Sequence, residues 1–170
     1  MPENTILSQS NIDFILKLLG KARSIAVDMQ KDAKVFEKTG PYDKVTEADH
    51  AISKLLITGL SERFINDTVI SEESESFNID IFDKNKRTWL IDPIDGTNSY
   101  ADQTNQYAVM IGLVYNKKPV FGFVLAPSTG VVYYGGPNYK LKTHSFNDPN
   151  LAQQTQTIDE KVIVSKTINL

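Results

Sequence analysis

The chain has 170 residues, 41% of them hydrophobic, and its 18 Lys and Arg against 21 Asp and Glu give a formal net charge of −3. A chain of this length can bury roughly 70% of the surface that its unfolded form exposes, so we expect one self-sufficient soluble domain. The absence of cysteine excludes disulfide frameworks, Cys-ligated zinc, iron–sulfur clusters and thiol nucleophiles.

Two amphipathic helices are predicted in the first third of the chain. Residues 11–37 carry apolar side chains at three- and four-residue spacing, which predicts a helix with Ser10 as its N-cap and a stop at Gly40-Pro41. A second stripe of this kind predicts a helix over residues 47–64, with Thr46 as its N-cap. Each helix would bury one apolar face.

After residue 64 the apolar pattern becomes that of strands, separated by turn residues. The predicted strands are Thr68–Ser71, Thr88–Asp92, Tyr107–Tyr115, Val120–Ala126, Val131–Tyr134 and Lys161–Ser165. Residues 137–158 are polar without a clear period and are expected to form a long loop. Because the last three long runs are close in sequence, antiparallel hairpins are the expected pairing among them. The predicted fold class is α+β, with two N-terminal helices packed on one face of a mainly antiparallel sheet.

The acidic residues are concentrated in one part of the chain. Residues 43–95 contain twelve Asp and Glu but only six Lys and Arg. No basic stripe that could displace counterions from a nucleic acid is visible, so we expect no nucleic-acid polymer as a partner. The acidic part is either a solvated surface or a pocket that accumulates cations.

Three acidic clusters occur there, at Asp43–Asp49, Ser71–Ser74 and Trp89–Thr97. In the third cluster a predicted strand leads into Asp92, and Asp95 follows at a spacing that can turn both carboxylates toward one point. Gly96 then permits a turn or a close backbone approach. Carboxylates gathered at strand ends repel one another unless a cation lies among them, and Mg²⁺ is the usual one.

Each cluster also has an interpretation without chemistry. Residues 92–96 could form an ordinary turn, and Glu72 could be a surface residue. Asp49 lies three residues after Thr46, so a capping interaction could account for it. It is the conjunction of the three clusters, in this order, that favours a functional site.

The three clusters, in this order and at this spacing, resemble the inositol monophosphatase family, which includes 3′(2′),5′-bisphosphate nucleotidases. The similarity extends through Tyr107–Gly135, and the string Trp-Leu-Ile-Asp-Pro-Ile-Asp-Gly-Thr that ends at Thr97 is its most specific part. The resemblance implies a Mg²⁺-dependent, lithium-sensitive phosphomonoesterase with layered architecture and two or three Mg²⁺ ions in a complete site.

The resemblance also implies roles for individual residues. Glu72, Asp92 and the backbone carbonyl of Ile94 would hold a first metal, and Asp92 with Asp95 would hold a second. Asp49 and Thr97 would orient the attacking water, with Glu72 counted among the catalytic residues, and Gly96 and Thr97 would offer backbone N–H groups to the phosphate. Two metals can clamp the attacking and leaving oxygens of an in-line displacement, so no covalent nucleophile is required.

Family members continue into a second domain, which supplies a further metal-binding Asp from a Trp-Asp segment and most substrate contacts. The single tryptophan here, Trp89, belongs to the first half, so we expect residues 1–170 to be the N-terminal metal-binding catalytic domain. Three origins stay open: a cut or proteolysed fragment, a natural truncation, or a protein completed by a partner. We expect weak metal binding, little turnover, and self-association through exposed apolar surface, which allows a homo-oligomer.

The expected substrate is a small phosphate ester. Residues 118–127 and Tyr133-Tyr134 favour the 3′(2′),5′-bisphosphate nucleotidase branch, whereas Asn98 stands where that branch tends to carry Lys or Arg, and Pro137–Tyr139 replace its usual Gly-Ala turn. Inositol monophosphate or another sugar phosphate is the alternative, and a non-catalytic metal- or phosphate-binding module is a further one. No signal-peptide pattern or membrane-spanning run is visible, so a cytoplasmic location without a membrane partner is expected.

Overall fold

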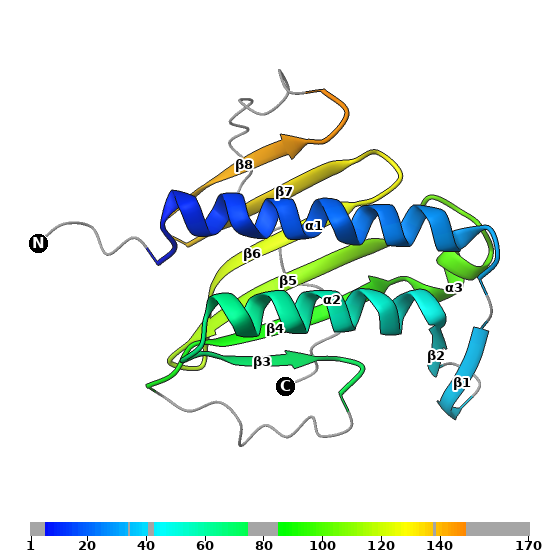
Figure 1. Ribbon diagram of the computed structural model, residues 1–170, viewed down its shortest axis with the longest axis horizontal. Helices are drawn as coiled ribbons and strands as arrows, with labels where there is room; N and C mark the ends of the chain where they lie inside the picture. Colours follow the sequence, from blue (N-terminus) through cyan, green and yellow to red (C-terminus); the bar gives the residue numbers. More distant parts are fainter. Residues whose placement is uncertain (1–5, 34, 41–42, 75–84, 138, 149–170) are drawn as a thin grey trace, which may run out of the picture.

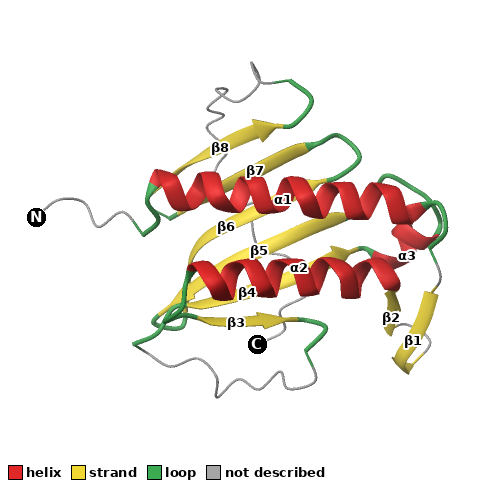
Figure 2. Cartoon of the chain, in the orientation of Figure 1, coloured by secondary structure: helices red, strands yellow, loops and turns green. Residues whose placement is uncertain are grey.

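Two long helices lie side by side on one face of a six-stranded sheet (Figures 1 and 2). The computed structural model describes residues 6–33, 35–40, 43–74, 85–137 and 139–148. The helices are α1 (Gln9–Gln30), α2 (Glu47–Arg63) and the short α3 (Thr97–Ala101). The strands are β1 (Val35–Gly40), β2 (Asp43–Thr46), β3 (Thr68–Ser71), β4 (Thr88–Asp95), β5 (Ala108–Tyr115), β6 (Lys118–Ala126), β7 (Val131–Gly136) and β8 (Tyr139–Ser145).

The six-stranded sheet has the order β3-β4-β5-β6-β7-β8. β3 pairs with β4 in parallel, and every later pair is antiparallel. β1 and β2 form a separate antiparallel hairpin. The predicted fold class, helices on a mainly antiparallel sheet, is therefore confirmed.

The hydrophobic core lies between the helices and the sheet. It contains Leu19 of α1, Leu56 of α2, and Trp89, Ile111 and Phe123 of the sheet, all of them buried. The helices approach each other closely at Gly59, where an added Cβ would lie 2.8 Å from the Leu18 Cδ1 atom. None of the helices in the described ranges is both long enough and apolar enough to cross a membrane.

The first predicted helix was too long at its C-terminal end. α1 ends at Gln30, and residues 35–40 pair with residues 43–46 instead of continuing the helix. The Phe36 side chain is 47% exposed, so it does not continue the buried face of α1. The pairing of β1 with β2 is therefore more favourable here than a continuation of the helix that the apolar period predicted. The N-cap was also shifted, because the Ser8 side chain, not that of Ser10, accepts the N–H of Asn11 at 3.3 Å.

The predicted long loop over 137–158 was wrong for its first part. Tyr139–Ser145 forms β8, an edge strand beside β7. Lys140 and Lys142 obscured the strand period, and lysine is a residue that edge strands commonly carry. Residues 149–158 and the predicted strand Lys161–Ser165 lie outside the described residues.

The second helix and the other described strands were confirmed, with boundaries that differ by a few residues. Thr46 is the N-cap of α2, and it forms a capping box with Asp49. β4 continues to Asp95, beyond the predicted end at Asp92. The extension matters because it carries the third acidic cluster into the sheet.

Candidate active site

The acidic residues gather at one end of β3 and β4. Because these two strands are parallel, their carboxyl ends meet at the same end of the sheet. The start of α2 and the short α3 lie at that end as well (Figure 1). Segments far apart in the sequence thus bring Asp49, Glu72, Asp92 and Asp95 to one region.

A bulge in β4 lies between Asp92 and Asp95, whose charges interact. Asp92 is opposite Met110 and Asp95 is opposite Ala108, with an irregular register between them. Residues three apart in a regular strand point to opposite faces, and one extra residue reverses that relation. Gly96 follows with φ 91°, and a Cβ there would lie 2.9 Å from the Gln106 carbonyl oxygen. Only glycine fits this turn without strain.

Asp92 lies in a strongly acidic environment. Burial raises its pKa to about 8, and the charges of Glu72, Asp95 and Asp49 add to this rise, as does a side-chain hydrogen bond with Glu72. Desolvation and like charges both disfavour an ionised carboxyl. Burial and like charges therefore favour the protonated form of Asp92 unless a cation binds beside it.

Asp49 sits at the buried start of α2, with 2% of its surface exposed. Its Oδ2 atom accepts the Thr46 backbone N–H at 2.8 Å and the Thr46 hydroxyl at 2.5 Å. Burial raises the pKa of Asp49, the Thr46 hydrogen bonds oppose the rise, and the charge of Glu73 reinforces it. The structural role that the sequence allowed for Asp49, a capping interaction, is therefore present.

Ile94 and Thr97 are joined across the turn. The Thr97 hydroxyl donates to the Ile94 carbonyl oxygen at 3.1 Å, and the Ile94 side chain is buried with 2% exposed. A carbonyl oxygen has two lone pairs, so this bond does not exhaust the acceptor capacity of Ile94.

Glu72 is an exposed residue just after the end of β3. Its backbone N–H donates to the Ile91 carbonyl at 2.9 Å, which continues the parallel pairing and places Glu72 beside the Asp92 segment. In the described part of the chain, no three Asp, Glu or His side chains meet as a ready-made metal cage. The ligand sets expected from the sequence contain two carboxylates per ion, with a backbone carbonyl added for the first, so they do not require such a cage.

The sequence did not predict the hydrogen bonds that join α3 and the residues after it to α1. Tyr100 is fully buried, and its hydroxyl donates to the Ala26 carbonyl at 2.8 Å. The Gln30 side-chain amide donates to the carbonyls of Tyr100 and Thr104 at 3.2 and 2.9 Å. These partners are seventy or more residues apart in the chain, so no local pattern reveals them.

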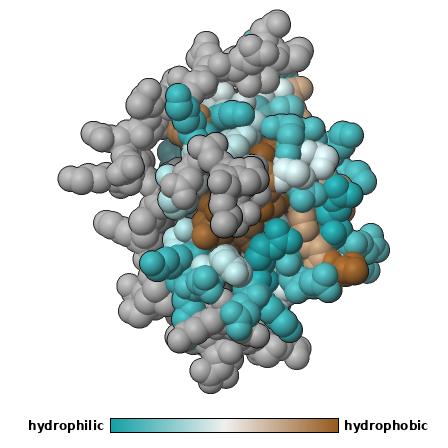
Figure 3. Space-filling model, turned by 90° about the vertical axis from the view of Figure 1, so that its left-hand side faces the viewer, coloured by the Kyte–Doolittle hydropathy of each residue, from teal (hydrophilic) through white to brown (hydrophobic). Residues whose placement is uncertain are grey.

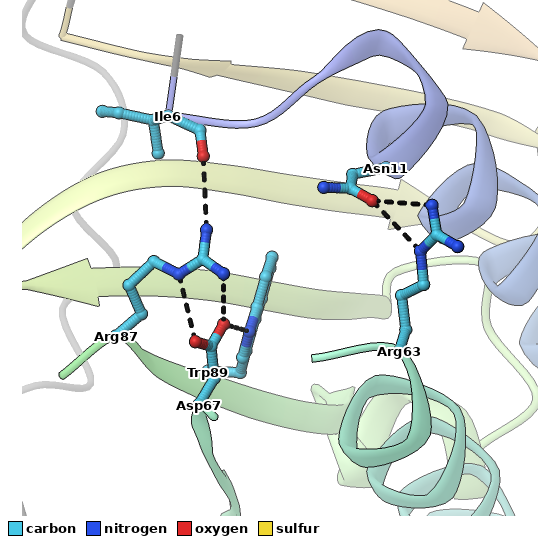
Figure 4. Close-up of polar contacts among 6 residues, drawn as sticks. All are labelled: Ile6, Asn11, Arg63, Asp67, Arg87 and Trp89. Carbon is cyan, nitrogen blue, oxygen red and sulfur yellow. Dashed lines mark hydrogen bonds and ion pairs between the residues drawn. The ribbon is translucent and has the colours of Figure 1, made fainter. Parts of the chain in front are cut away.

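The opposite end of the same strands is built differently (Figures 3 and 4). The Asp67 carboxylate accepts from Arg87 Nε at 3.1 Å and Nη2 at 3.0 Å, and from Trp89 Nε1 at 2.9 Å. Asp67 and Arg87 border a hollow of about 680 Å³, which Ile65, 81% exposed, also lines. Hydrophobic residues show among hydrophilic ones on this end of the molecule. The hollow therefore lies at the opposite end of β3 and β4 from Glu72, Asp92 and Asp95.

The sequence and the fold both match known proteins. Residues 9–169 match the sequence model described as "Inositol monophosphatase family". The chain is 33% identical over 128 residues to inositol monophosphatase 1 of Bos taurus, which covers 75% of this chain and 46% of that protein. It is 40% identical over 90 residues to the 3′(2′),5′-bisphosphate nucleotidase CysQ of Haemophilus influenzae, which covers 53% of this chain and 34% of that protein.

A solved structure described as an IMPase/NADP phosphatase complexed with Mg²⁺ and phosphate has the same fold. It superposes with a TM-score of 0.68 at 21% identity and covers 79% of this chain and 51% of that one. The chain thus spans about half the length of this structure and less than half of the two curated relatives.

Proposed function

Because the chain belongs to the inositol monophosphatase family, we propose that it acts as a Mg²⁺-dependent phosphomonoesterase on a small phosphate ester. The observation that carries the proposal is the group of carboxylates around Asp92. Burial and neighbouring negative charges raise the pKa of Asp92 to about 8. Keeping this carboxyl ionised lowers the stability of the folded protein unless a cation binds beside it.

The donor set fits Mg²⁺, which takes oxygen ligands. Glu72, Asp92 and the Ile94 carbonyl would hold a first ion, and Asp92 with Asp95 would hold a second. Magnesium bound there supplies charge neutralisation for the ester and acidifies a water molecule. The complex of the solved relative with Mg²⁺ and phosphate supports this choice of ion.

The protein's own groups then position the reactants. Asp49 and Thr97 would orient the attacking water, and Thr46 donates two hydrogen bonds to Oδ2 of Asp49, which hold its carboxylate at the start of α2. The backbone N–H groups of Gly96 and Thr97 would donate to the phosphate oxygens. The left-handed turn at Gly96 supports this role, because a side chain at that position would crowd the backbone.

For the substrate we propose a 3′(2′),5′-bisphosphate nucleotide, with inositol monophosphate or another sugar phosphate as the alternative. Residues 118–127 and the Tyr133-Tyr134 pair support the nucleotide. Relatives of both kinds are similar to the chain, at 40% identity over 90 residues for the nucleotidase and 33% over 128 for the inositol phosphatase.

The test measures phosphate release from each substrate by the 170-residue chain, with and without Mg²⁺, beside Asp92→Asn. Asn keeps the shape of the side chain and removes its charge, and circular dichroism checks that the variant folds. We expect release that requires Mg²⁺ and is lost at least 100-fold in Asp92→Asn. Release that is equal in Asp92→Asn, or that does not require Mg²⁺, would contradict the proposed site. Mg²⁺ binding without any release from wild type would favour the non-catalytic binding module, with which the capping role of Asp49 is consistent.

A further inference from the structure

Two buried serine hydroxyls join α2 to the end of β3. The Ser53 Oγ atom donates to the Ser71 Oγ atom at 2.8 Å. Ser53 is 5% exposed and Ser71 is fully buried. A buried hydroxyl that loses its partner costs more than an exposed one, because water cannot replace the bond. The pair is therefore a firm link between two elements that are distant in sequence.

The link joins the two segments that carry the acidic residues outside β4. Ser53 lies one helical turn after Asp49 on the same buried face of α2. Ser71 directly precedes Glu72, and its Oγ atom also accepts the Glu73 N–H at 3.4 Å. The Ser74 N–H donates to the Ser71 carbonyl at 2.9 Å and closes the turn. The acidic turn is thus bound to α2 through Ser71.

Electrostatic repulsion acts against this arrangement. The charge of Glu73 raises the pKa of Asp49, and the charges of Glu72 and Asp49 raise that of Asp92. Like charges on α2 and on the turn therefore push the two segments apart whenever the carboxyls are ionised. A hydrogen bond from α2 to Ser71 opposes that separation.

We infer that Ser53 is a positioning residue that holds the acidic turn against α2 and so raises the affinity of the site for a divalent cation. The inference rests on the proposed function and deepens it. The side chain of Ser53 donates its hydrogen bond to Ser71, which is not a predicted metal ligand. It acts through Ser71, so that Glu72 and Asp49 stay in place before the cation binds. Substitution of groups that hydrogen-bond to metal ligands commonly changes the metal affinity ten- to a hundredfold. Ser53 acts through one further residue, so its substitution should have a smaller effect.

The experiment is a calorimetric titration of the full 170-residue chain with Mg²⁺, comparing wild type and Ser53→Ala. Ser145→Ala is the matched control, because Ser145 is also a buried serine, 6% exposed, whose Oγ accepts the N–H groups of Asn147 and Asp148 at 3.2 and 3.0 Å. It lies on β8, at the other edge of the sheet from β3. We expect roughly three- to tenfold weaker Mg²⁺ binding for Ser53→Ala and a change below twofold for Ser145→Ala.

Thermal unfolding in EDTA separates a positioning role from a merely structural one. Both alanine variants should lower the midpoint, but only Ser53→Ala should weaken Mg²⁺ binding. Ser53→Thr, which keeps a hydroxyl, should restore the affinity. Ser53→Cys, a weak donor of similar size, gives a second comparison if the alanine variant does not fold, with an expected intermediate affinity.

The outcomes distinguish the two claims. Wild-type affinity in Ser53→Ala, or in Ser53→Cys where that variant must serve, overturns the positioning role and leaves the proposed function standing. An equal loss in Ser145→Ala overturns it as well, because the effect is then a general loss of stability. A wild-type chain that binds no Mg²⁺ contradicts the proposed function, and the inference that rests on it fails too.

Discussion

The two ends of β3 and β4 contain the same kind of side chain in opposite electrostatic settings. At the start of the strands, Asp67 meets the Arg87 guanidinium and the Trp89 indole N–H. At their ends, Asp92 meets Glu72, and the charges that raise its pKa are those of other carboxylates. The first end stabilises the fold, whereas the second destabilises it until something positive is bound.

This difference shows how one pair of strands can serve structure and function separately. The Asp67 charge at the first end is neutralised by Arg87 within the protein, so its contribution to stability does not depend on a ligand. The charge at the second end is left for a ligand to neutralise, which is the usual way in which functional sites keep strongly shifted pKa values.

The largest expected effect is the pH dependence of stability at the acidic end. The pKa of Asp92 is about 8 in the folded protein and near 3.8 in the unfolded chain. Between these values the folded state holds a proton that the unfolded state has released, so stability falls as pH rises from about 4 to 8. The slope for one such group approaches about 1.4 kcal/mol per pH unit.

Urea unfolding in EDTA across this pH range measures that slope. Asp92→Asn carries no titrating proton and should flatten it, while Asp67→Asn at the other end should leave it as in wild type. A wild-type stability that rises between pH 4 and 8 contradicts the description of the acidic end.

The next largest effect is expected at the paired end, from Asp67→Ala. The change removes the acceptor of the buried Trp89 N–H and the partner of Arg87, whose side chain is 35% exposed. The unfolding free energy should fall by about 2 to 3 kcal/mol. The surface variant Asp28→Ala is the control and should change it by less than about 0.5 kcal/mol. A loss of Mg²⁺ affinity specific to Asp67→Ala would show that the two ends are not separate.

A smaller effect is expected from Thr46→Val at the start of α2. The variant loses the N-cap hydroxyl, which accepts the Asp49 N–H at 3.4 Å and donates to the Asp49 carboxylate. The expected cost is about 1 to 2 kcal/mol in unfolding free energy. Thr46→Ser keeps both bonds and should recover most of that loss. If Val and Ser variants are equally stable, the capping box contributes little.

The sequence revealed the elements whose signals are local. The Thr46 cap three residues before Asp49, the strand leading into Asp92, and the turn at Gly96 could all be predicted, and each is present. The hairpin of β1 and β2 was missed because a helical period continued into it, and β8 was missed because lysines obscured its alternation.

The connections between elements could not be predicted in the same way. The Ser53–Ser71 bond joins residues eighteen apart, and the Tyr100 hydroxyl reaches Ala26, seventy-four residues away. Such contacts depend on how α2 and α1 pack on the sheet, which no local pattern encodes. The catalytic roles given to Asp49, Glu72 and Thr97 stay predictions, since they concern a reaction and not a contact.

The most direct test counts the protons released when Mg²⁺ binds to the wild-type chain. Calorimetric titrations at pH 7 in buffers of different ionisation enthalpy give that number. With the pKa of Asp92 at about 8, binding at its carboxylate should release roughly one proton at pH 7 and far fewer at pH 9. Binding without proton release at pH 7, or no binding at all, would contradict the claim that these carboxylates form a divalent cation site.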